Sequence, residues 1–291
     1  MRIRLLLVLC FGLVACASKP VLNNSLVRPW DAKLAQESLS SKPYIAHYSR
    51  GNYELLYLAT HHENDPTNNP VQLINELFKQ FQFNFILIES IPHSEGENPQ
   101  WFVQKAMGSI KTDIVEGGEP VYTGYLASFR HLPFAGAEMS HKEIFLGLEA
   151  RGYTDIDILG FYLVRQIPSW RQEGQNKNGL LVRNAPAFLH SFCANFGIPA
   201  ASCPKLEQID AWYRRTSGKP LSADVGEESN LLRMATTLAI MRDEFLLQLI
   251  QDALVKYKKV AVVYDGIHFL TLKTSLEAYF GKLTGAYSIE N

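Results

Sequence analysis

Four apolar, strand-like segments of this chain each run directly into residues that can bind a metal ion or transfer a proton. The segments and the residues that end them are 53–60 with His61 and His62, 85–88 with Glu89, 132–137 with Glu138, and 260–264 with Asp265 and His268. In open parallel α/β sheets, ligands bind just beyond the carboxyl ends of the strands. If these segments are neighbouring parallel strands, we expect their carboxylates and imidazoles to meet in one crevice.

The order of the other segments favours an α/β fold. Between residues 53 and 141, strand-like segments alternate with amphipathic helical ones, and the alternation returns after residue 229. The segment 84–89 has too few polar positions for a half-exposed strand, which is typical of central parallel strands. We therefore predict that residues 49–291 form a mainly parallel central sheet flanked by helices.

The middle of the chain has a different character. Residues 153–229 contain helical periodicity and polar loops, but no convincing strand pattern. We expect a helical insertion or lid over the carboxyl edge of the sheet.

The N-terminal segment is typical of an export signal. Arg2 and Arg4 precede an apolar run over residues 5–15, which is too short to span a bilayer but suits a signal-peptide core. The run ends in Leu13-Val14-Ala15-Cys16, which resembles the bacterial lipobox. We expect residues 1–15 to be removed and Cys16 to carry fatty acyl chains such as palmitate.

This interpretation predicts an exported, membrane-anchored lipoprotein. Residues 16–48 would form a tether and a first helix. Ala17 is not the aspartate that signals retention in the inner membrane, so we expect the periplasmic face of the outer membrane in a double-membraned bacterium. The alternative is an ordinary signal peptide cut near Ala17, with Cys16 incidental.

Charge and cysteine content narrow the class further. The formal net charge is −1 and no long basic stretch is present, which argues against nucleic acid as a partner. Cys193 and Cys203 lie ten positions apart across a turn-like insert, and an even pair in an oxidising compartment predicts a disulfide. Two buried free thiols are the alternative.

The strand-end residues suit two kinds of chemistry. Carboxylates and imidazoles together are ligands for Zn²⁺, Mn²⁺, Co²⁺ or Fe²⁺, and we take His62, Glu89, Glu138 and His268 as the candidate metal ligands. Without a metal ion, a histidine near a desolvated glutamate can act as general base on water. Taken singly, each glutamate could instead belong to a structural ion pair.

The order of these motifs resembles that of the TIKI/TraB superfamily. This group includes erythromycin-esterase-like proteins, ChaN-type haem-binding lipoproteins, TraB/PrgY pheromone-shutdown proteins and TIKI peptidases, and its hallmarks are two Gly-x-x-His motifs, two glutamates and an arginine. The matching positions here are Ala59-Thr60-His61-His62, Glu89, Glu138, Arg242 and Asp265-Gly266-Ile267-His268. The resemblance covers about residues 53–281, and both motif glycines are replaced, by Ala59 and Asp265.

The resemblance implies a lipid-anchored, metal-dependent hydrolase that acts on an ester or amide bond of a small-molecule or peptide substrate. Mn²⁺, Co²⁺ or Zn²⁺ would be the cofactor, and Arg242 would give electrostatic support to the four candidate ligands. His61, Asp265 and His141 are secondary candidates, with Asp265 able to add a ligand. A homodimer is compatible with these expectations.

Two alternatives stay open. The ChaN-type relatives imply a haem- or iron-binding lipoprotein without catalysis, in which exposed tyrosine and histidine side chains would be axial ligands. A catalytically silent domain, whose polar strand ends form only an ion-pair network, is the other.

Overall fold

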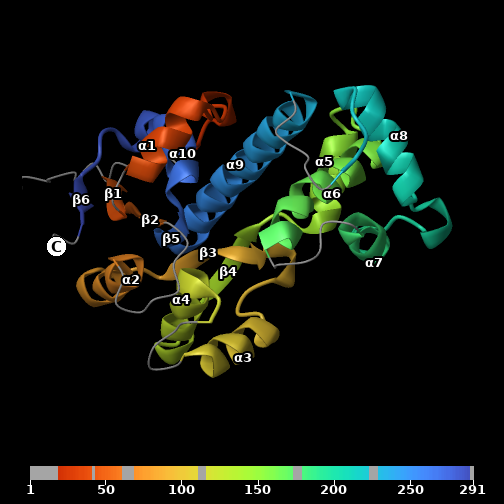
Figure 1. Cartoon of the computed structure of the whole chain (residues 1–291). Helices are drawn as coiled ribbons and strands as arrows, with labels where there is room; N and C mark the ends of the chain where they lie inside the picture. The colour runs from red at the N-terminus through yellow and green to blue at the C-terminus, as the bar shows by residue number, and fades with distance from the viewer. Residues whose placement is uncertain are drawn as a thin grey trace, which may run out of the picture.

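The structure, a computed structural model, describes residues 19–40, 43–60, 69–110, 116–172, 179–222 and 229–288. A six-stranded mixed sheet lies at the centre of this part of the chain, with helices around it (Figure 1). Its strands are β1 (Tyr44–Arg50), β2 (Tyr53–Thr60), β3 (Phe85–Pro92), β4 (Phe134–Glu138), β5 (Lys259–Asp265) and β6 (Gly285–Tyr287). The predicted α/β fold class is confirmed.

The four predicted strands are neighbours in the sheet. The strand order is β4-β3-β5-β2-β1-β6. The pairs β4–β3, β3–β5 and β5–β2 are parallel, whereas β1 is antiparallel to both β2 and β6. The carboxyl ends of β2, β5, β3 and β4 therefore lie along one edge.

Strand β1 was not predicted from the sequence. Residues 16–48 were expected to form a tether and a first helix, and a helix, α1 (Ala32–Ser40), is present. The chain then enters β1, which forms a hairpin with β2 through a turn that contains Gly51 at φ 62°. Ile45, Ala46 and Tyr48 of β1 are fully buried, because this strand is covered on both faces.

The central strands of the sheet alternate their side chains between two helical layers. Leu55 and Tyr57 of β2 pack in the core under α1, α9 (Ser229–Tyr257) and α10 (Gly266–Phe280). Leu56 and Leu58 pack on the other side, in a core shared with α2 (Asn69–Gln80), α3 (Gln100–Ser109) and α4 (Gly118–Phe129). Burial of both faces explains why these strands are almost uniformly apolar.

The middle of the chain is helical, as the periodicity predicts. It contains α5 (His141–Glu149), α6 (Asp155–Gln172), α7 (Leu180–Phe196) and α8 (Leu206–Ser217). Together with the first half of α9, these helices enclose an apolar core of their own, which lies beside the sheet (Figure 1). The predicted disulfide is confirmed: Cys193 of α7 is bonded to Cys203, with the sulfurs 2.03 Å apart.

Three short 3₁₀ helices complete the described elements: η1 (Asn24–Leu26), η2 (His93–Glu95) and η3 (Ala200–Ser202). Of the helices in the described ranges, none has both the length and the apolar character that crossing a bilayer requires. Cys16 and the rest of the expected signal peptide lie outside these ranges.

Candidate functional site

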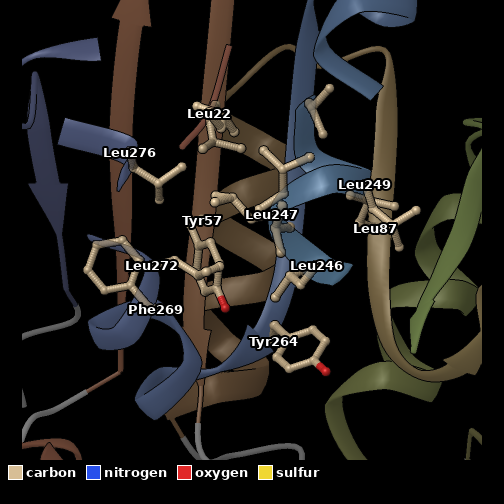
Figure 2. Packing of buried hydrophobic residues seen from close by; sticks show 14 of the residues in the cluster. Leu22, Tyr57, Leu87, Leu246, Leu247, Leu249, Tyr264, Phe269, Leu272 and Leu276 are labelled. Carbon is tan, nitrogen blue, oxygen red and sulfur yellow. The ribbon is translucent and has the colours of Figure 1, made fainter. Parts of the chain in front are cut away.

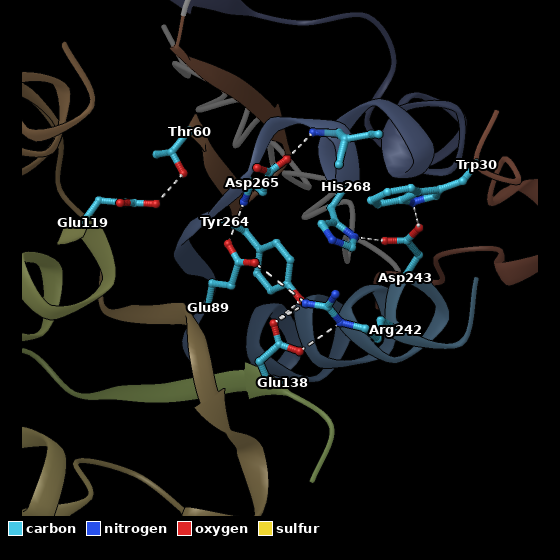
Figure 3. A network of polar contacts seen from close by, with 11 residues as sticks. Trp30, Thr60, Glu89, Glu119, Glu138, Arg242, Asp243, Tyr264, Asp265 and His268 are labelled. Atoms are coloured by element: carbon cyan, nitrogen blue, oxygen red, sulfur yellow. Dashed lines mark hydrogen bonds and ion pairs between the residues drawn. The ribbon is translucent and has the colours of Figure 1, made fainter. Parts of the chain in front are cut away.

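Polar side chains gather at the carboxyl edge of the parallel strands, where β5 pairs Asp265 with Thr60 of β2 and β4 pairs Glu138 with Pro92 of β3. Figure 3 shows side chains from β3, β4, β5, α9 and α10 converging there. Glu89, Glu138, Arg242 and His268, which were predicted from the sequence as site residues, all belong to this group or adjoin it.

Arg242 of α9 binds the carboxylate that ends β4. Its Nε and Nη2 donate to the two oxygens of Glu138 at 3.1 and 2.6 Å, and Nη2 also lies 3.7 Å from an oxygen of Glu89. The Tyr264 hydroxyl donates to Glu138 at 2.6 Å and accepts from Arg242 at 3.1 Å. The guanidinium therefore links the ends of β3, β4 and β5. Its third nitrogen, Nη1, makes no hydrogen bond to a described residue.

The ion pair sets the charge state of this cluster. Burial raises the pKa of the Glu138 carboxyl, but the charge and hydrogen bonds of Arg242 and the Tyr264 hydroxyl outweigh burial and hold that pKa below its ordinary value. Burial raises the pKa of the Tyr264 hydroxyl well above its ordinary value. At neutral pH, Glu138 is thus an anion, while Tyr264 is a neutral hydrogen-bond donor.

Glu89 is held at the point where β3 changes direction. Its side chain is 7 % exposed and accepts a hydrogen bond of 2.9 Å from the backbone N–H of Asp265. The next residue, Ser90, has a φ of 68°, and the pairing of β3 with β4 shifts register here. A left-handed residue in a strand turns the chain, so that Glu89 faces the start of α10.

Asp265 caps the helix that carries His268. Its carboxylate accepts a hydrogen bond of 2.8 Å from the Ile267 N–H, which is the usual role of an aspartate at a helix N-cap. Asp265 is therefore already engaged as the N-cap of α10.

His268 forms a buried pair with Asp243. It is 3 % exposed, and its Nδ1 donates to one oxygen of Asp243, which is fully buried. The other oxygen of Asp243 accepts a hydrogen bond of 3.3 Å from the indole N–H of Trp30. The imidazole also contacts the rings of Trp30 and Tyr264, with centroids 5.3 and 4.8 Å apart. Within the described ranges, Nε2 of His268 makes no hydrogen bond.

The remaining predicted residues lie elsewhere. His61 and His62 come after Thr60 and fall outside the described residues. His141 is not brought to this edge: it is exposed at the start of α5, and its ring contacts Phe192 and Phe196 of α7. It begins the helix after Ser140, whose capping box with Glu143 directs the chain away from Glu138.

Four participants in this group were not predicted from the sequence. Asp243 and Tyr264 are adjacent in sequence to predicted residues, and Trp30 lies in the segment expected to be a tether. Glu119, in the first turn of α4, is 1 % exposed and lies 3.5 Å from the Thr60 hydroxyl (Figure 3). The signal for Asp243 and Glu119 would have been an acidic residue inside an otherwise buried helical face.

The described residues do not by themselves form a metal site. Among them, no group of three or more histidine, cysteine, aspartate or glutamate side chains has the arrangement of metal ligands. Glu138 is bound to Arg242, and Nδ1 of His268 is bound to Asp243, which leaves Nε2 as the nitrogen able to bind a metal.

The axial ligands expected for haem were exposed tyrosine and histidine side chains. Tyr264 and His268 are instead buried; the Tyr264 hydroxyl is bonded to Glu138, and Nδ1 of His268 is bonded to Asp243. Comparisons of this chain with protein-family models, with curated proteins and with solved structures found no match.

Proposed function

We propose that this protein is a lipid-anchored hydrolase of the TIKI/TraB type, which uses His268 as general base to activate water against an ester or amide bond. The observation that carries the proposal is the buried hydrogen bond between His268 and Asp243, placed beside Arg242 at the carboxyl edge of the sheet.

The Asp243 carboxylate would fix the protonation of the imidazole. A carboxylate can only accept hydrogen bonds, so Nδ1 of a neutral His268 carries the proton and Nε2 carries the lone pair. The indole of Trp30 holds the second oxygen of Asp243, which prevents the carboxylate from rotating. An imidazole oriented in this way by a buried carboxylate is a common general base for hydrolysis.

Arg242 would stabilise the charge that develops on the substrate. Glu138 occupies Nε and Nη2, which fixes the plane of the guanidinium. Nη1 makes no hydrogen bond within the described residues, and the side chain is 27 % exposed, so that a substrate oxygen can approach Nη1. In the proposed reaction, Nε2 of His268 takes a proton from water, and the hydroxide attacks the carbonyl carbon. Nη1 binds the oxyanion, and the leaving oxygen or nitrogen takes the proton back as the scissile bond breaks.

Hydrolysis of ester and peptide panels by the full-length protein in detergent tests the proposal. The wild-type protein should hydrolyse at least one substrate, and His268→Asn should lower its kcat/KM by about 100-fold or more. His190→Asn is the matched control, because His190 is exposed on α7. Wild-type activity in His268→Asn would reject the role of His268, and inactivity of the wild-type protein on every substrate would reject the function.

The same assays separate the alternatives. Mn²⁺, Co²⁺ and Zn²⁺ are added one at a time, because His62 and Nε2 of His268 are the proposed metal-binding groups. Stimulation that disappears in His62→Ala would support a metal-dependent reaction. A Soret shift on addition of haemin, without hydrolysis, would support the ChaN-like alternative.

The lipid anchor and export are part of the proposal. The Cys193–Cys203 disulfide supports an oxidising compartment, since such bonds rarely persist in the cytosol. Radioactive palmitate should label the wild-type protein in bacteria and should not label Cys16→Ser. Equal labelling of the two proteins would contradict the role of Cys16.

A further inference from the structure

Tyr57 carries a buried hydroxyl group that takes no part in the proton transfer or the oxyanion binding of the proposed reaction. It lies in β2, is fully buried, and packs against Phe269 of α10 with ring centroids 5.0 Å apart. Phenylalanine would fill this position equally well, so the hydroxyl needs a separate explanation. Figure 2 shows the hydroxyls of Tyr57 and Tyr264 pointing toward the same end of the sheet, which is the end that carries the candidate site.

The Tyr57 hydroxyl has no hydrogen-bond partner within the described part of the chain. Buried hydroxyls are nearly always paired with protein or with ordered water, because an unpaired one loses its hydration without compensation. The hydroxyl can therefore take a hydrogen-bond partner that the described residues do not supply.

The surroundings of the hydroxyl belong to the candidate site. Burial raises the pKa of Tyr57 well above its ordinary value, and electrostatic coupling to Tyr264, Glu89, Asp243 and Asp265 raises it further. These four residues belong to the candidate site at the carboxyl edge of the sheet. The hydroxyl thus points to the end of the sheet that carries the candidate site (Figure 2), and the acidic groups of that site influence it electrostatically.

Tyr48 of β1 provides a natural comparison. Its hydroxyl is also buried and unpaired within the described residues, and its ring packs in the same core. After burial, however, the groups that raise its pKa are Glu277 and Tyr44, which lie outside the candidate site. The two tyrosines share burial and chemistry, and they differ in their position relative to the site.

We propose that the Tyr57 hydroxyl hydrogen-bonds an oxygen atom inside the candidate site, supplied by a bound water molecule or by the substrate, and that this contact positions the reacting groups. The inference rests on the proposed hydrolytic function. Tyr57 is thereby a positioning residue: the oxygen that it holds would lie between the core of the sheet and the Asp243–His268 pair.

The test compares Tyr57→Phe with Tyr48→Phe in the full-length protein. Removal of a hydroxyl that has no partner should stabilise the fold, so Tyr48→Phe should raise Tm by about 2–4 °C and leave kcat/KM unchanged. Tyr57→Phe should lower kcat/KM by at least about 10-fold. If Tm also falls, the oxygen belongs to resident water, whereas a raised Tm assigns the oxygen to the substrate.

Two results would overturn the inference. One is a Tyr57→Phe variant whose kcat/KM stays within about twofold of wild type, whatever its Tm. The second result comes from crystallography, and it is needed if the wild-type protein hydrolyses no substrate and the proposed function itself has failed. In that case, a high-resolution crystal structure decides: an ordered oxygen within hydrogen-bond distance of the Tyr57 hydroxyl would support a binding role, and an empty position would reject it.

Discussion

Replacing Arg242 with methionine should leave two buried carboxylates without the cation that contacts both of them. The Glu138 side chain is 14 % exposed, that of Glu89 is 7 % exposed and that of Arg242 is 27 % exposed. Breaking a buried ion pair by removing one partner costs about 3–5 kcal/mol, and the partial exposure of Arg242 favours the lower end, about 3 kcal/mol. Methionine keeps most of the apolar stem, so the loss reports on charge rather than on packing.

Urea unfolding followed by circular dichroism measures this change. Besides Arg242→Met, the series contains Glu138→Gln and the double variant, because a double-mutant cycle isolates the coupling of the pair. The double variant should be more stable than Arg242→Met alone, since it no longer buries the unpaired Glu138 carboxylate. The reasoning would be refuted if the free energy of unfolding of Arg242→Met were within about 0.5 kcal/mol of wild type, or if the effects of the two single substitutions added strictly in the double variant.

The pH dependence of the same variant gives a second readout. The pKa of Glu138 is lowered in the folded protein, so its contribution to stability is present above the ordinary value of 4.5 and is lost as pH falls through the folded value. Without Arg242, burial raises that pKa instead. The difference in unfolding free energy between wild type and Arg242→Met should therefore narrow as pH falls, first above pH 4.5 as Glu138 of the variant becomes protonated, and then below 4.5 as the wild-type protein loses its contribution.

Three further predictions concern other parts of the chain. Asp265→Ala should lower the free energy of unfolding by about 1 kcal/mol in thermal melts, because it removes the cap from the Ile267 N–H; an unchanged Tm would argue against that cap. The Cys193→Ser/Cys203→Ser variant should have a free energy of unfolding about 2–3 kcal/mol below that of wild type, as expected for a crosslink over ten positions. Reductant should then have no further effect on the Tm of the variant. In a bacterial host, Cys16→Ser should move from the membrane to the soluble fraction, and retention in the membrane would contradict lipidation.

Much of the fold could be predicted because β2, β3, β4 and β5 are buried on both faces and read as continuous apolar segments. The topology of parallel sheets then places Glu89 and Glu138 at one edge without knowledge of any side-chain contact. Strand β1 was not predicted because its antiparallel hairpin with β2 interrupts the α/β alternation.

The contacts within the site could not be predicted in the same way. Trp30 and Asp243 are 213 positions apart, and their hydrogen bond depends on how the N-terminal segment packs against α9 and α10. The role of Asp265 as a helix cap was open to prediction, since an aspartate before a helix is a common N-cap.

The measurement that tests the central claim most directly is kcat/KM of Asp243→Asn on a substrate that the wild-type protein hydrolyses. If Asp243 fixes the proton of His268 on Nδ1, the kcat/KM of the asparagine variant should be lower by about 100-fold or more. The asparagine amide can donate to Nδ1 and so hold the imidazole in the wrong tautomer. Asp252→Asn, at an exposed position of the same helix, should retain wild-type kcat/KM. Equal kcat/KM for Asp243→Asn and the wild-type protein would contradict the proposal that this buried pair is the catalytic base.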